Sequence, residues 1–124
     1  MGRSRYLITE ADKLHFMTCT VVEWQQAVFT RPETVQIILD YLQYQRQQAG
    51  LKLYGYVILV NHLHFIAQAS ELDRCVASFK SYTARQIIEY LKQQNAKQLL
   101  ERLHFAKLSH KQDHDNQFWQ DFHA

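Results

Sequence analysis

Several residue types and patterns are scarce in this sequence, and each shortage excludes a class of protein. Three glycines and one proline among 124 residues leave no linker, repeat or low-complexity tract, so the length suits a single domain over residues 1–124. No apolar run reaches the ~18 residues that a membrane-spanning helix needs. The formal net charge is only +2. Any contact with nucleic acid would therefore come from a local basic surface.

Cysteine is equally scarce. Cys19 and Cys75 stand alone, with neither a CxxC motif nor the spacing of a zinc finger. Two isolated thiols in a chain without an apolar leader segment are typical of the reducing cytoplasm. The sequence therefore predicts a cytoplasmic protein. Its content of 47% hydrophobic and 13% aromatic residues is enough to build a substantial core.

Hydrophobic patterns predict three strands and three helices. In chain order these are a strand at 14–24, a helix at 30–50, strands at 51–60 and 62–69, and helices at 70–94 and 95–106. This order is typical of an α+β sandwich of the ferredoxin-like, split βαβ kind, with an antiparallel sheet and the two main helices on one face. The segment QFWQDF, residues 117–122, has the composition of one further strand that begins near the end of the chain.

The two long helices carry start and stop signals. Thr30 with Glu33, and Ser70 with Asp73, have the spacing of capping boxes. Gly50 is suited to end the first helix. A stripe of residues at helical spacing predicts the buried face of the second helix: Leu72, Val76, Phe79, Thr83, Ile87 and Leu91.

Two histidines stand out in the strand at 62–69. His62 and His64 share one face because side chains alternate along a strand, and their backbones lie about 7 Å apart. Leu63 and Phe65 take the opposite face, toward the helices. Two converging neutral imidazoles suit a divalent cation and leave positions for water or substrate oxygens. Among seven histidines, such a pair also arises by chance, so the bare pattern leaves both interpretations open.

The surroundings of the pair favour the metal. The segment LYGYVILVNHLHFIAQ, residues 53–68, resembles the signature strand pair of the single-tyrosine HUH transposases, which include small insertion-sequence transposases and relatives associated with palindromic repeats. In that family an aromatic strand leads into a YVIMPNHVHLL-like sequence. Val60 departs from it, since proline usually precedes the asparagine. The residues that match are Tyr56, Val57, Ile58, Asn61, His62, Leu63 and His64.

The resemblance covers most of the chain. FMTCTVVEWQQAVF, residues 16–29, looks like the family's first strand and the segment that leads to its first helix. ASFKSYTARQI, residues 77–87, is similar to its second conserved helix. QFWQDFHA, residues 117–124, resembles the stretch that precedes its last helix.

The resemblance implies a specific chemistry. Members of the family bind single-stranded DNA beside a hairpin and hold Mg²⁺ or Mn²⁺ with the two histidines, here His62 and His64, and a third ligand. The ion polarises the scissile phosphate. A tyrosine attacks the phosphorus and forms a 5′-phosphotyrosine, and the reverse reaction rejoins ends. The family works as a dimer, so the resemblance also implies a homodimer that acts in DNA transposition.

The family's nucleophile has no counterpart in this sequence. It lies in a YIHNNP-like helix after the QFWQDFHA stretch, and the third metal ligand can come from the same helix. The resemblance therefore predicts a domain truncated at its C-terminus. Tyr82 is the fallback nucleophile, although an ordinary amphipathic-helix role is the simpler interpretation. Nearby Lys80 and Arg85 are candidates for phosphate contacts, or for a solvated face that pairs with carboxylates.

Three functions remain open on the sequence. The first is a transposase-family enzyme, the second an inactive remnant that only binds DNA, and the third a metal-binding structural protein. With the nucleophile's helix lacking, we expect weak binding of hairpin-bearing single-stranded DNA, no covalent tyrosyl adduct at a useful rate, and an apolar surface that awaits a partner.

Overall fold

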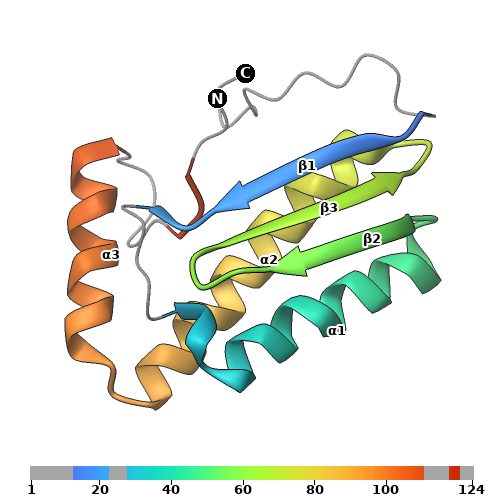
Figure 1. Cartoon of the computed structure of the whole chain (residues 1–124). Coiled ribbons are helices and arrows are strands. Elements are labelled where there is room, and N and C mark those ends of the chain that lie inside the picture. Colours follow the sequence, from blue (N-terminus) through green and yellow to red (C-terminus); the bar gives the residue numbers. More distant parts are fainter. Residues whose placement is uncertain (1–12, 23–27, 111–117, 121–124) are drawn as a thin grey trace.

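The computed structural model describes residues 13–22, 28–110 and 118–120, with side chains of the last helix described as far as residue 104. Its elements run in the order that the sequence predicts (Figure 1). They are β1 (His15–Thr20), the short 3-10 turn η2 (Val28–Thr30), α1 (Pro32–Gln48), β2 (Lys52–Ile58), β3 (His62–Gln68), α2 (Leu72–Gln93) and α3 (Lys97–His110). None of the helices described is long and apolar enough to cross a membrane.

The sheet has the order β1-β3-β2, with β3 in the middle and antiparallel to both neighbours. Hence β1 and β2 run parallel to each other without touching, and α1 connects them, which is the split βαβ arrangement. Residues 118–120 add a short antiparallel contact outside β1, through the bridge between Val21 and Trp119. The α+β, ferredoxin-like fold predicted from the sequence is thereby confirmed.

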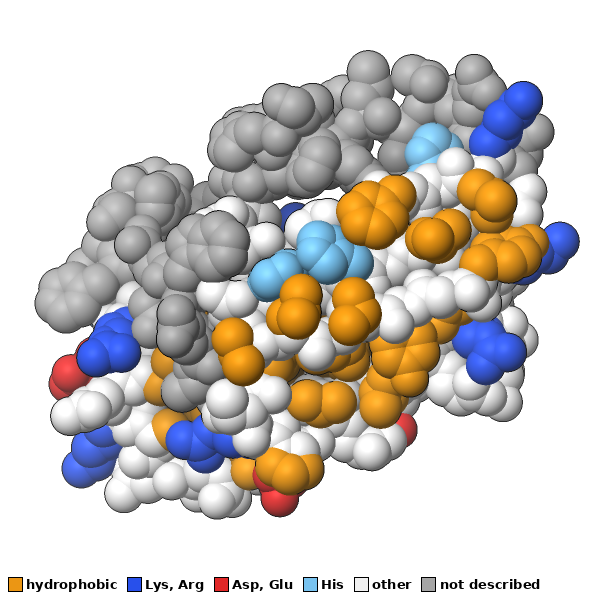
Figure 2. All heavy atoms as spheres, viewed as in Figure 1, with side chains coloured by type: hydrophobic (Ala, Val, Ile, Leu, Met, Phe, Trp, Pro, Cys, Tyr) orange, Lys and Arg blue, Asp and Glu red, His pale blue; other side chains and the backbone are white. Residues whose placement is uncertain are grey.

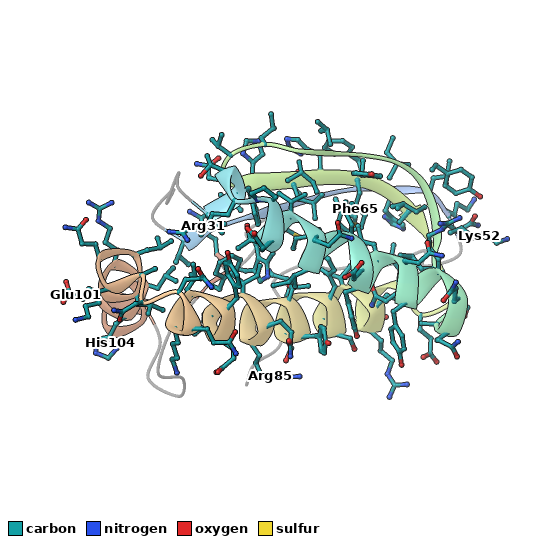
Figure 3. The ribbon with its side chains drawn as sticks, turned by 90° about the horizontal axis from the view of Figure 1, so that it is seen from below. Arg31, Lys52, Phe65, Arg85, Glu101 and His104 are labelled. Atoms are coloured by element: carbon teal, nitrogen blue, oxygen red, sulfur yellow. The ribbon has the colours of Figure 1, made fainter. Side chains whose placement is uncertain are left out.

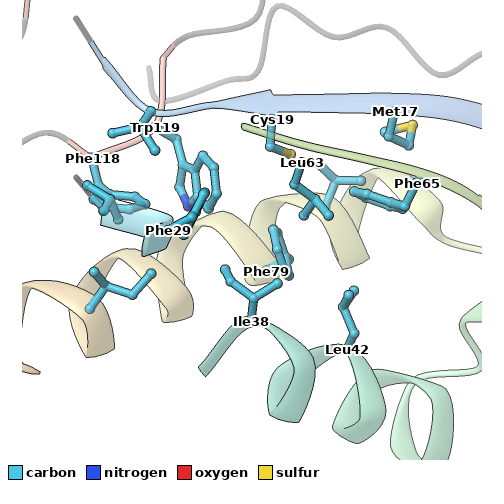
Figure 4. Packing of buried hydrophobic residues seen from close by; sticks show 14 of the residues in the cluster. Met17, Cys19, Phe29, Ile38, Leu42, Leu63, Phe65, Phe79, Phe118 and Trp119 are labelled. Atoms are coloured by element: carbon cyan, nitrogen blue, oxygen red, sulfur yellow. The ribbon is translucent and has the colours of Figure 1, made fainter. Parts of the chain in front are cut away.

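Both long helices lie against one face of the sheet, and the other face carries no described helix (Figures 1 and 3). The core fills the space between these layers (Figure 4). Met17 and Cys19 of β1 and Leu63 and Phe65 of β3 are buried there against α1 and α2. The predicted stripe of α2 is confirmed in full, since all six of its residues are buried.

The helix starts differ from the prediction. The N-cap residues are Arg31 and Glu71, and neither helix has a side-chain cap hydrogen bond, so neither predicted capping box forms. Thr30 belongs to η2, and the hydroxyl of Thr34 donates to the Arg31 carbonyl at 3.0 Å. The preceding 3-10 turn thus takes Thr30 out of the cap position. The stop signal is confirmed, because Gly50 follows α1 with a φ of +71°, a conformation that glycine adopts readily.

Buried polar contacts tie residues 118–120 to α2. The indole Nε1 of Trp119 donates to the Thr83 hydroxyl at 3.0 Å, and that hydroxyl donates to the Phe79 carbonyl at 2.6 Å. The Lys80 ammonium donates to the Gln120 carbonyl at 3.1 Å. Because Thr83 is fully buried, its loss would strand a buried indole N–H without its acceptor.

We therefore expect Thr83→Val to lower the free energy of unfolding by about 1–3 kcal/mol, because it leaves the indole N–H unsatisfied. Thr83→Ser is the matched control. It keeps the hydroxyl and loses one methyl group, which costs about 0.8 kcal/mol. Urea unfolding followed by circular dichroism measures both. A valine variant as stable as the serine variant would show that the Trp119 contact contributes nothing.

Candidate metal and nucleic-acid site

The two histidines of β3 point to the open face of the sheet. His62 and His64 are half-buried there, while Leu63 between them is fully buried on the helix side. Their ring centroids lie 4.8 Å apart and their planes meet at 82°. The alternation of the strand therefore places both imidazoles where they can share one ligand.

Neighbouring side chains orient each imidazole through its Nδ1. The Asn61 amide oxygen lies 2.9 Å from Nδ1 of His62, and the Thr18 hydroxyl lies 3.0 Å from Nδ1 of His64. An amide oxygen only accepts, so Nδ1 of His62 carries the proton and Nε2 has the lone pair that a metal requires. A hydrogen-bonded Nδ1 of this kind commonly fixes a metal-binding histidine.

The antiparallel pairing of β1 with β3 brings a third aromatic ring, that of Phe16, next to the two imidazoles. The register between β1 and β3 sets Thr18 opposite His64 and Phe16 opposite Ile66. Phe16 stacks on the His64 ring with a centroid distance of 5.2 Å and an interplanar angle of 22°. His64 is therefore held by one strand neighbour on its nitrogen and by another on its ring face.

The surroundings of His62 favour its neutral form. Partial burial, and then the charge that His64 would carry, lower the pKa of the His62 imidazole below its ordinary value. Neutral imidazole is the form that binds metal. His62 is therefore held in the form that can bind a metal across the neutral pH range.

The donor chemistry fits part of a metal shell. The two imidazoles supply two nitrogen ligands, and the described residues contain no group of three or more His, Cys, Asp or Glu side chains that could hold an ion. Mg²⁺ strongly prefers an octahedral shell of oxygens, including waters. Of the two expected ions, the nitrogen pair therefore favours Mn²⁺.

The structure does not bring the other predicted site residues to the histidines. Tyr82 stacks on Tyr41 of α1, with a centroid distance of 4.5 Å, and the Arg85 guanidinium lies 5.9 Å from the Tyr82 ring. Arg85 points away from the sheet (Figure 3). Lys80 is engaged with the carbonyl of Gln120 beside β1. Because α2 lies against the face opposite the histidines, Tyr82 and Arg85 belong to the helix layer and do not lie beside the histidine pair.

Three residues of the site were not singled out by their chemistry in the sequence: Phe16, Thr18 and Asn61. Phe16 and Thr18 alternate along β1 on the same face, which is a visible signal. Only the register with β3 shows that they meet His64, and register is a property of the folded sheet. In the comparisons with known proteins, no protein-family model and no curated protein matches the chain. The geometry of the site is therefore the main support for a function.

The lowered pKa of His62 makes a testable statement about pH. An NMR titration of the imidazole protons should place the His62 pKa below the ordinary 6.5, and His64→Ala should raise it because a neighbouring charge is removed. The unfolded chain then binds the proton more readily, so stability falls as the pH drops below about 6.5. A His62 pKa at or above 6.5 that does not respond to His64→Ala would contradict the site as described.

Proposed function

We propose that this domain binds single-stranded DNA next to a hairpin and uses His62 and His64 to hold a divalent ion for strand cleavage and rejoining, as the resemblance to HUH transposases implies. One observation carries the proposal, namely the pair of oriented imidazoles on an open sheet face. Mn²⁺ or Mg²⁺ is the expected ion.

The residues divide the work of such a site. When bound, a divalent ion would act as a Lewis acid toward a phosphate oxygen. His62 and His64 present their nitrogens from one strand, while Asn61 and Thr18 hold the ring orientations. Orientation matters because a ligand displaced by about 1 Å can lower a rate a hundredfold.

The charge of the open face suits a polyanion. The strands β1, β2 and β3 contain no Asp or Glu, and exposed Lys13 and Lys52 flank or begin them. Figure 2 shows hydrophobic side chains gathered around the histidines, with Lys and Arg toward the rim of the described surface. A phosphate backbone would therefore meet cations and no carboxylate on these strands.

The proposed cleavage step is an attack of a tyrosine hydroxyl on the phosphorus. The P–O bond to the 3′ oxygen breaks, which leaves a 5′-phosphotyrosine and a free 3′-hydroxyl. We do not assign the nucleophile to Tyr82, because it lies in the helix layer, and no sequence motif marks another described tyrosine. A homodimer that acts in the cytoplasm belongs to the same proposal.

Two other functions compete with this one. A remnant that only binds DNA would keep the open face without cleavage, and a structural metal protein would keep the histidines without DNA. The exposed apolar side chains of the sheet favour a binding partner over a purely structural role.

Metal and DNA binding can be tested together. With Mn²⁺, a labelled hairpin-flanked single strand should bind more tightly than with chelator, and His62→Ala or His64→Ala should weaken Mn²⁺ binding by about tenfold or more, measured by electron paramagnetic resonance of the free ion. His104→Ala on α3, exposed and far from the sheet, is the matched control.

The outcomes separate the three functions. A covalent protein–DNA band on a denaturing gel that the histidine variants lack supports the enzyme. Affinity that falls steeply with salt but yields no band indicates the remnant. Manganese binding without any DNA affinity would contradict the proposal and indicate a structural metal protein.

If a covalent band does form, we expect Tyr82→Phe to leave it unchanged, because the Tyr82 ring stacks on Tyr41 of α1 in the helix layer, opposite the histidines. The same denaturing gel, run on the two proteins at equal concentration, provides the measurement. Loss of the band in Tyr82→Phe with an unchanged circular dichroism spectrum would make Tyr82 the nucleophile after all.

A further inference from the structure

Phe16 is an unusual residue for its position. It lies on β1, the strand that pairs with β3 beside the histidine pair, and 64% of its surface is exposed, the largest value among the exposed large hydrophobic residues described. Its partner across the sheet, Ile66, is also exposed, at 39%. Burial of such a ring is favourable, so Phe16 and Ile66 together offer an apolar surface on which a ligand can pack.

The Phe16 ring is ordered on one face and can stack with a planar ligand on the other. One side of Phe16 is fixed by the nearly parallel His64 ring at a centroid distance of 5.2 Å, and His64 is in turn fixed by Thr18. A ring that is braced on one side offers an ordered surface, so a ligand that stacks on it loses little further side-chain entropy. Planar aromatic groups are the natural ligands of such a platform.

Charge decides which planar ligand fits. The open face carries no carboxylate on its three strands and has lysines at its margins. An acidic polymer with flat side groups, which is single-stranded nucleic acid, matches both properties. A second copy of this chain would bring the same lysines against themselves and would supply no planar polyanion.

We propose that Phe16 is a base-stacking residue. A base of the bound strand would stack on its ring, and the phosphate next to that base would lie over the histidine pair. This inference rests on the proposed function, since it takes the strand to pass over the histidine pair. Stacking would fix the position of the neighbouring phosphate relative to His62 and His64. Phe16 would thus set where the strand sits and would take no part in the chemistry.

Substitutions at Phe16 distinguish a flat ring from apolar bulk. Phe16→Leu keeps an apolar side chain and loses the π-face, whereas Phe16→Trp keeps one. In fluorescence anisotropy with a labelled single strand of about 12 nucleotides and Mn²⁺, we expect the leucine variant to bind roughly five- to a hundredfold more weakly and the tryptophan variant to bind as well as wild type. Tyr44→Leu, which removes an exposed aromatic ring (53%) on α1, is the control without effect.

An abasic scan adds a test of the contact itself. One abasic nucleotide is moved along the strand, and at a single position the wild-type protein should lose the affinity that Phe16→Leu has already lost. At that position the two proteins should bind equally, since the two changes remove one interaction. Equal losses in both proteins at every position would overturn the proposal.

Failure of this inference can be told apart from failure of the proposed function. If His62→Ala abolishes the manganese-dependent binding while Phe16→Leu binds as wild type, only the stacking role falls. If wild type binds no single strand at all, both fall. If Phe16→Leu alters sedimentation and leaves DNA affinity intact, the ring belongs to an interface between copies and the stacking role is wrong.

Discussion

The register of β3 is the constraint on which the rest of this structure depends. Leu63, Phe65 and Ala67 are buried beneath the sheet, and burial of a Leu or Phe side chain contributes about 1.5–3 kcal/mol. A slip by one residue would exchange these side chains for the histidines. It would also bury imidazoles without partners, at a cost of about 1–3 kcal/mol for each polar group. Core packing therefore holds the histidine pair on the open face.

The same constraint passes to the neighbouring strands. Because β1 pairs with β3 in one register, Thr18 meets the His64 nitrogen and Phe16 meets its ring, and a shift of β1 by two residues would break both contacts. Two buried contacts secure the outer edge of β1. Trp119 bridges to Val21, and its indole bonds to Thr83 of α2. A helix on the far face thus helps to fix a ring on the open face.

Sequence patterns predicted the features that depend on local periodicity. They failed for features that depend on how separate segments pack against one another. The α2 stripe, the alternation at His62 and His64, and the end of α1 at Gly50 each follow from a local period or a backbone preference. The capping box at Thr30 failed because Thr30 belongs to the turn η2 and Arg31 takes the N-cap position. The side on which Tyr82 lies could not be read from its helix, since it depends on which sheet face α2 covers, and no local pattern encodes that choice.

The apolar surroundings of the pair have an electrostatic consequence as well as a steric one. Partial burial lowers the pKa of His62 and so keeps a neutral ligand. The same low-polarity surface weakens dielectric screening, so a cation held there would attract a phosphate oxygen more strongly than it would in open water. A base stacked on Phe16 would exclude further water from the histidine pair. The attraction between a bound cation and the phosphate would therefore be stronger when a base is stacked there.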